Sequence, residues 1–197
     1  MIHEAEVFIL ADEAALRVYS QVTGERWDAI LPPVFDMEGA DQPIPLRQAV
    51  NHFAYDDAWV PDMLAGRTMD QAGRDRYDGD QLGDDPAASL TRIVRAAQDA
   101  ARRTTDAAAT VHCSWGDVTT DDYLWQLNIA RTIGAHDVAN VIGVDDGISE
   151  EQARWMYEGT FPMAEMWRSF GIYRAPVEVP GDASWRDRYL GLTGRRA

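Results

Sequence analysis

The sequence predicts an all-α fold: an antiparallel four-helix bundle with an additional short C-terminal helix and a long acidic loop. Apolar residues recur at helical spacing in several stretches, no segment alternates convincingly as a strand would, and glycine, proline and capping residues separate the stretches. Long helices joined by loops pack as a bundle. At 197 residues the chain fits a single domain over 1–197.

The first half of the chain contains two expected helices and the acidic loop. The first helix is predicted over residues 4–22, before Gly24, and a proline-rich connection follows it. The second begins near Leu46 and is disturbed by Pro61. Residues 66–85 are polar, rich in glycine and acidic, which is typical of a flexible loop or a lid.

Capping patterns define the third and fourth expected helices. Asp85 followed by Pro86 is a favourable helix start, because the carboxylate caps free N–H groups and proline fits the first turn. This third helix is predicted to end near Thr104. The fourth is predicted to begin at about Thr119 and to stop at Gly143, where glycine suits a helix C-terminus.

A fifth helix is expected after a capping box that starts at Ser149, and it should continue to Phe170 with Pro162 inside it. The remaining residues, 171–197, contain proline, glycine and charge and are expected to form a tail. Residues 185–192 within that tail predict the short amphipathic helix.

Composition excludes several classes of partner. The formal net charge is −15 and every one of the 18 basic residues is arginine, so nucleic acid and anionic membranes are poor partners. Cys113 is the only cysteine, which rules out an intrachain disulfide and fits a reducing compartment. No apolar run approaches a membrane span. We expect a cytoplasmic monomer or homodimer with a small-molecule partner.

Three segments carry a resemblance to a known superfamily: PLRQAVNH at residues 45–52, DVANVIG at 137–143, and WRDRYLGLTGR at 185–195. Their order and content resemble the DinB-like and mycothiol-dependent maleylpyruvate isomerase superfamily, in particular its actinobacterial metal-binding branch. The resemblance implies a helical bundle around one divalent metal, zinc or nickel. In relatives, the metal activates the thiol of a cofactor such as mycothiol.

The metal ligands that the resemblance implies are a histidine on the second helix and a Glu/His-x-x-x-His pair on the fourth. His52 matches the first position, but Ala130 and Gly134 occupy the other two and cannot bind a metal. His136 lies about 200° around the helix from Gly134 and would join His52 only after a local register shift. We therefore expect a degenerate site with neither metal nor mycothiol.

The catalytic candidates are His52, Asp56 and Arg131. His52 and Asp56 are four residues apart and share a helical face, and we expect His52 to point inward toward the fourth helix. Arg131 has the geometry to clamp a carboxylate with two hydrogen bonds. The simpler alternatives are a buried histidine satisfied by a neighbour and an exposed salt bridge.

Further residues are candidates for binding a substrate. Small residues on the fourth helix would leave volume in the pocket, although close packing against the third helix explains them equally well. Aromatic side chains beside His52 would line the same space, although most aromatics form the core. The substrate-binding candidates are Tyr55, Trp59, Asn128, Ala130, Gly134 and Asp137.

Three functions are compatible with these residues. The first is a degenerate, metal-free enzyme of isomerase, cyclase or transferase type that acts on or binds a small organic molecule in the central pocket, as in secondary metabolism. The second is a metal- and mycothiol-dependent isomerase or S-transferase with an unorthodox ligand set. The third is a non-catalytic binding or resistance protein.

Overall fold

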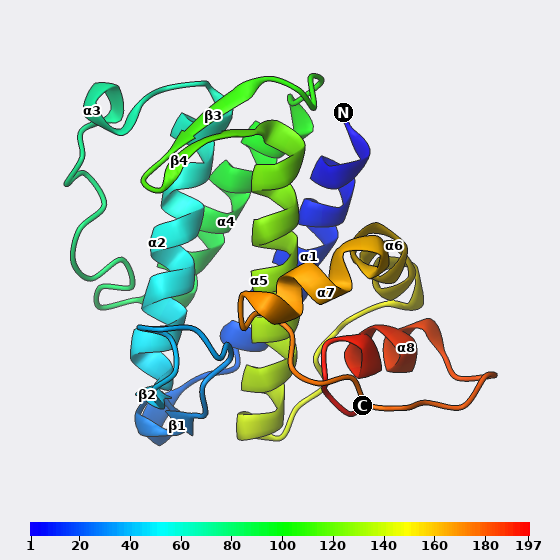
Figure 1. The fold of residues 1–197 in the computed structure, drawn as a ribbon. Coiled ribbons are helices and arrows are strands. Elements are labelled where there is room, and N and C mark those ends of the chain that lie inside the picture. Colours follow the sequence, from blue (N-terminus) through cyan, green and yellow to red (C-terminus); the bar gives the residue numbers. More distant parts are fainter.

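The computed structural model describes residues 1–197 and confirms an all-α fold, to which two short two-stranded sheets are added (Figure 1). No helix is both long and apolar enough to cross a membrane. The four long helices are α1 (His3–Tyr19), α2 (Leu46–Leu64), α4 (Pro86–Arg102) and α5 (Thr120–Ile142). The shorter elements are η1 (Gly24–Asp28), β1 (Ile30–Leu31), β2 (Ile44–Pro45), α3 (Met69–Ala72), β3 (Thr110–Cys113), β4 (Gly116–Thr119), α6 (Glu150–Thr160), η2 (Phe161–Met163), α7 (Ala164–Ser169) and α8 (Trp185–Leu192).

Packing among the long helices is uneven. Helix α1 lies against α5 and α4, and α2 lies against α4, whereas α2 and α5 touch each other little. Buried alanines on α1 and α4, such as Ala11, Ala15 and Ala97, allow the close approaches because they add little bulk. The side between α2 and α5 is therefore left open, and this opening positions the candidate site.

The predicted helix ends agree with the structure wherever a local capping pattern defines them. The Asp85 carboxylate accepts a hydrogen bond from the Ala88 N–H at 3.0 Å, and Gly143 ends α5 in the left-handed conformation. At the start of α6, Ser149 accepts from the Gln152 N–H, but the Gln152 side chain donates to Thr132 in the core. Only half of the expected capping box therefore forms.

Several expected boundaries are wrong. Helix α1 ends at Tyr19, and α2 continues through Pro61 to Leu64, because this proline falls in the last turn, where its missing N–H removes a single helical bond. The fifth helix breaks near Pro162 into α6, η2 and α7. The β3–β4 hairpin was not expected, because its strands are four residues long and too short for a visible alternation.

The acidic segment 66–85 lies along the outer side of α2 and does not cover the opening between α2 and α5 (Figure 1). Its middle is fixed to α2: Tyr77 donates a hydrogen bond to Asp62 at 2.9 Å, and Asn51 accepts from the Gln81 N–H at 2.7 Å. Leu82 is fully buried in the core. In this structure the segment is therefore packed on α2 and does not lie over the pocket.

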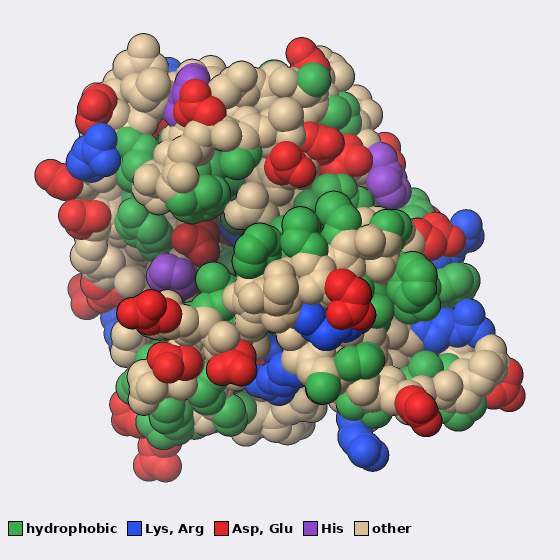
Figure 2. All heavy atoms as spheres, in the orientation of Figure 1, with side chains coloured by type: hydrophobic (Ala, Val, Ile, Leu, Met, Phe, Trp, Pro, Cys, Tyr) green, Lys and Arg blue, Asp and Glu red, His purple; other side chains and the backbone are tan.

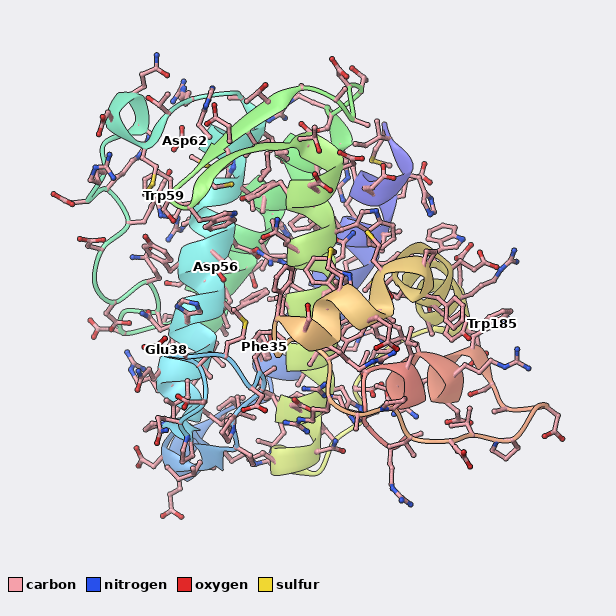
Figure 3. The ribbon with its side chains drawn as sticks, in the orientation of Figure 1. Phe35, Glu38, Asp56, Trp59, Asp62 and Trp185 are labelled. Carbon is pink, nitrogen blue, oxygen red and sulfur yellow. The ribbon has the colours of Figure 1, made fainter.

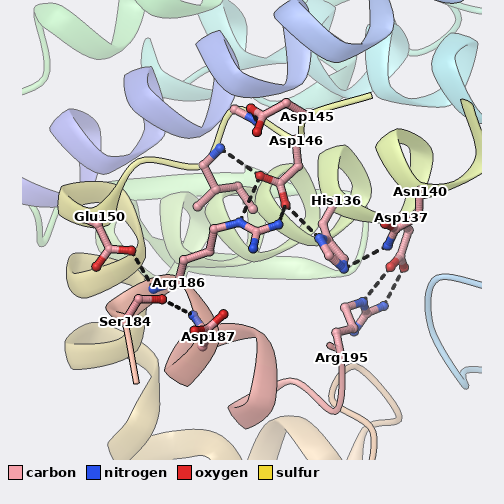
Figure 4. A network of polar contacts seen from close by, with 12 residues as sticks. His136, Asp137, Asn140, Asp145, Asp146, Glu150, Ser184, Arg186, Asp187 and Arg195 are labelled. Carbon is pink, nitrogen blue, oxygen red and sulfur yellow. Dashed lines mark hydrogen bonds and ion pairs between the residues drawn. The ribbon is translucent and has the colours of Figure 1, made fainter. Parts of the chain in front are cut away.

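The segment 171–197 is part of the core and not a tail. Helix α8 packs on α6, and Tyr189 and Leu190 are fully buried in a cluster between α5 and the C-terminal elements. Arg195 is 4% exposed and makes a bidentate ion pair with Asp137 of α5, at 2.7 and 2.8 Å. Near it lies a second buried network in which His136 and Arg186 both bind Asp146 (Figure 4).

A buried ion cluster joins α1, α2 and α5. Arg131 of α5 is 1% exposed, and its guanidinium donates to Asp12 of α1 at 3.1 Å and to Asp57 of α2. The rings of Phe8 and Phe53 lie 5.1 and 5.3 Å from the guanidinium carbon, which adds cation–π attraction. Helices α1, α2 and α5 therefore meet at the Arg131 side chain, and they make few other polar contacts with one another.

Replacing Arg131 with methionine should strongly destabilise the fold, because two carboxylates would be left buried without their partner. The expected loss in the free energy of unfolding is about 3–5 kcal/mol, measured by urea denaturation. The matched control is Arg154→Met, since Arg154 pairs with Glu158 on the surface and such pairs contribute less than about 1 kcal/mol. Equal losses in the two variants would contradict a supporting role for the cluster.

Candidate functional site

A cleft of about 560 Å³ opens between α2, α5 and the connection of residues 31–44 that joins β1 to β2. This volume lies in the range of small-molecule pockets. In Figure 3, Asp56 lies on the α2 side of the cleft, while Phe35 and Glu38 of the connection lie below it. Figure 2 shows the surface hollowed beside α2, with histidine and acidic atoms at the margin.

The cleft gathers most of the residues that the sequence indicated. Trp59 lies in an adjoining hollow, and Asn128, Asp137 and His136 lie elsewhere. Because positions four apart share a face of a helix, α2 and α5 each direct one set of side chains into the cleft. The predicted residues that line it are His52, Tyr55, Asp56, Ala130, Arg131 and Gly134.

His52 lies at the mouth of the cleft and is not directed inward. Its side chain is 74% exposed, and Nε2 lies 3.8 Å from Oδ2 of Asp56. The expectation of an inward histidine is wrong, because no helix covers this side of α2, and Phe53 takes the inward position next to it. His52 and Asp56 nevertheless form an imidazole–carboxylate pair that faces a ligand-sized space.

Asp56 is the carboxyl group most suited to chemistry in the cleft. Its side chain remains 34% exposed, and apart from His52 no charged group contacts it. The surrounding walls remove part of its hydration, and this burial raises the pKa of Asp56, although the nearby charges of His52 and Arg131 oppose the effect. A carboxyl with a raised pKa in a cleft is a candidate proton donor and acceptor.

The Arg131 cluster forms the floor of the cleft. The expected role of Arg131 as a carboxylate clamp does not fit, because its guanidinium already serves Asp12 and Asp57. Each of these carboxylates keeps one buried oxygen without a hydrogen-bond partner. Burial raises the pKa of Asp12 to about 7, with Arg131 opposing the shift. The simpler expectation of an exposed salt bridge is also wrong, since the pair is buried.

Gly134 does not leave the empty volume that the sequence suggested. The Tyr19 hydroxyl from α1 fills this position: a Cβ atom on residue 134 would lie 2.8 Å from the hydroxyl oxygen. Ala130, one turn earlier, does face the cleft. The space where the resemblance implies a metal ligand on residue 134 is thus occupied by the Tyr19 side chain of α1.

The remaining candidates have structural roles. The Asn128 side chain is buried and donates to the Glu4 carbonyl at 3.1 Å, and Asp137 holds Arg195. His136 bonds to Asp146 through Nδ1 at 2.8 Å, and Asn140 contacts its other ring nitrogen. Burial raises the pKa of Asp146, but hydrogen bonds from His136 and Arg186 outweigh that effect and hold it well below its usual range.

The connection 31–44 is the part of the site that the sequence analysis missed. It contributes prolines, Phe35 and Ile44 to the cleft wall. The C-terminal segment anchors it: Arg195 donates to the Val34 carbonyl at 2.7 Å, and the Asp36 N–H donates to the Gly171 carbonyl at 2.7 Å. The proline cluster was the available signal, since a fixed, non-helical connection between two helices is a common place for a binding wall.

A divalent metal does not fit these residues. The cleft offers one imidazole and one carboxylate, from His52 and Asp56, while Ala130 and Gly134 supply no donor and His136 is engaged elsewhere. No group of three potential metal-binding side chains lies together in the structure. A catalytic zinc site needs three protein ligands, and the cleft supplies fewer.

Comparison of the chain with protein-family models, curated proteins and solved structures gave no match. The DinB-like resemblance is therefore a hypothesis that rests on the three sequence segments alone.

Replacing Gly134 with alanine tests the contact with Tyr19. Alanine is better than glycine within a helix by about 1 kcal/mol, but its Cβ would press against the hydroxyl oxygen at 2.8 Å. We expect Gly134→Ala to lower the free energy of unfolding in the normal background and to raise it in a Tyr19→Phe background. Urea denaturation of the four proteins measures this coupling, and identical effects in both backgrounds would contradict the contact.

Replacing Asp56 with asparagine should stabilise the fold at neutral pH. A raised pKa means that the folded state binds the Asp56 proton more tightly than the unfolded state, so stability falls as pH rises through the interval above 3.8. Asparagine removes this penalty. The gain over the parent protein should therefore be present at pH 7 and disappear below about pH 4. Denaturation across that pH range checks it, and a gain that grows toward acid pH would show the opposite shift.

Proposed function

We propose that this protein binds a small organic molecule in the cleft between α2 and α5, and that Asp56 and His52 exchange a proton with it. The observation that carries the proposal is the Asp56 carboxyl, which faces a space of about 560 Å³ with no hydrogen-bond donor of the protein assigned to it. Polar groups left free among the lining residues of a pocket are the usual means of orienting a ligand.

The reaction class that this pair supports is acid–base catalysis, as in an isomerase. One member of the pair takes a proton from one atom of the ligand, and the pair returns a proton to a neighbouring atom, so that no proton is gained or lost overall. The raised pKa of Asp56 favours this role, since a group whose pKa lies nearer the working pH both accepts and donates readily. His52 lies 3.8 Å away and can share the proton.

Arg131 is assigned a positioning role in this proposal. It lies beneath the cleft and fixes α5, which carries Ala130, relative to α2, which carries Asp56. Precise placement of catalytic groups by a rigid support is worth several kcal/mol in enzymes generally, about 7–11 in the best intramolecular cases. No contact between Arg131 and the reacting atoms is required.

The sequence resemblance extends the proposal to a four-helix bundle of the DinB type that has lost its metal site. The arrangement of α1, α2, α4 and α5 supports this reading, whereas the exposed position of His52 at the cleft mouth does not. A mycothiol-dependent transferase finds less support, because the metal that would activate the thiol lacks two of its three ligands.

A non-catalytic binding protein is the second candidate. The observation that favours it is the 74% exposure of His52, since a catalytic histidine is usually held by a further group and shielded from water. Turnover of a bound compound separates the two candidates.

A ligand screen against the cleft tests the proposal. Compounds that bind should lose at least tenfold in affinity for Ala130→Phe, which fills the cleft, and should keep their affinity for Ala88→Phe, a matched change on the exposed side of α4. Calorimetry measures the affinities. For any compound that is also converted, Asp56→Asn should lower kcat by about 10²–10⁴. Compounds that bind Ala130→Phe as tightly as the parent protein would contradict the assignment of the site.

A further inference from the structure

A second, smaller hollow adjoins the cleft beside Asp56. It has a volume of about 70 Å³, and Tyr55 and Asp56 line both spaces. Its other walls come from α2, α3, α5 and the β3–β4 hairpin, including Trp59, Tyr123 and Cys113. The Asp56 carboxyl thus lies at the junction of a large and a small space, and a ligand that reaches it can extend to both sides.

The two hollows carry no free positive charge. Only Asp56, His52 and Arg131 among their lining residues can be charged. The positive charge of Arg131 is neutralised by Asp12 and Asp57. The net charge of these three groups is −1 when both carboxyls are ionised, and zero when Asp12, whose pKa is raised, is protonated. With His52 neutral and Asp56 ionised, the site is therefore negative in either case, and it repels an anionic ligand.

The walls of the large space are suited to a cation. Aromatic residues from three parts of the chain line it, although Phe53 already lies against Arg131. An ammonium group that reaches the face of an aromatic ring is attracted by the quadrupole of the ring. Burial disfavours the ionised form of the Asp56 carboxyl. A protonated amine beside it would favour the ionised form again, because opposite charges attract. The rings are those of Tyr19, Phe35, Phe53 and Tyr55.

The two volumes limit the substituents on the amine. A dry cavity of about 150 Å³ is known to bind a benzene ring. The smaller hollow, at about 70 Å³, is less than half that size and fits a short alkyl group, whereas the larger one, at about 560 Å³, fits a ring system.

We propose that the ligand is an organic ammonium whose nitrogen binds Asp56, with a short alkyl substituent beneath the β3–β4 hairpin and a larger ring-containing group in the main cleft. This inference rests on the proposed function and names its ligand class. In the bound complex the Asp56 carboxylate pairs with the ammonium, so within the acid–base pair of the proposed function His52 is the member that takes and returns the proton.

The first test compares two compounds of the same shape. N-isopropyl-(1-naphthylmethyl)amine is protonated at pH 7, and isopropyl 1-naphthylmethyl ether carries no charge. Calorimetry should show the amine binding at least tenfold more tightly than the ether. In Asp56→Asn this preference should disappear, while binding of the ether is unchanged. Equal binding of both compounds to the parent protein overturns the charge assignment and leaves the proposed function standing. Failure of both compounds to bind overturns the ligand class, while the cleft as a site is tested separately by the loss of ligand binding in Ala130→Phe.

The second test uses Cys113, the single cysteine, which lines the small hollow. Burial, with a smaller contribution from Asp117, raises the pKa of this thiol to about 11, so reaction with N-ethylmaleimide should be slow and easily followed by mass spectrometry. The isopropyl amine at saturation should slow the labelling at least fivefold. 1-Naphthylmethylamine, which lacks the alkyl group, should not. Equal protection by the two amines would overturn the placement of the alkyl group.

Discussion

The guanidinium of Arg131 fixes the positions of helices α1, α2 and α5 relative to one another. It binds Asp12 and Asp57, which are 119 and 74 residues away in the chain, in a place that water does not reach. Buried charges are costly unless each is paired, so these helices are held in one relative arrangement. The hydrogen bonds of the guanidinium are directional, so they fix where the two carboxylates lie relative to α5.

The cleft follows from this arrangement. Because α1 lies against α5, the Tyr19 hydroxyl reaches the backbone of α5, and a Cβ atom at residue 134 would press against it. Helix α2 is fixed at Asp57 and otherwise touches α5 little. The neighbouring residue Asp56 therefore faces the cleft between α2 and α5 and is not packed against another helix. The connection 31–44, fastened by Arg195, closes the remaining side. Asp56 therefore stays in a partly desolvated space, and its raised pKa is a property that the fold imposes.

Local sequence patterns correctly predicted those features that depend on contacts between residues close together in the chain. The Asp85 cap, the Gly143 stop and the shared faces of His52 with Asp56 and of Ala130 with Gly134 depend only on residues a turn or two apart. The floor and the lower wall could not be predicted in this way, since they depend on contacts between distant segments. A signal for the floor did exist: Asp12 lies among apolar residues of α1, and a charged residue on such a face needs a buried partner. Nothing local indicated that its partner was Arg131, or that His52 would be exposed.

The central claim is that the space beside Asp56 is a ligand site. Soaking crystals of the protein with a library of small organic fragments, and locating those that bind, tests it most directly. Our account predicts that bound fragments collect between α2 and α5, with a polar atom within hydrogen-bond distance of the Asp56 carboxyl and apolar parts against Phe35 and Phe53. Fragments that bind only at other surfaces, with the cleft filled by water alone, would contradict it.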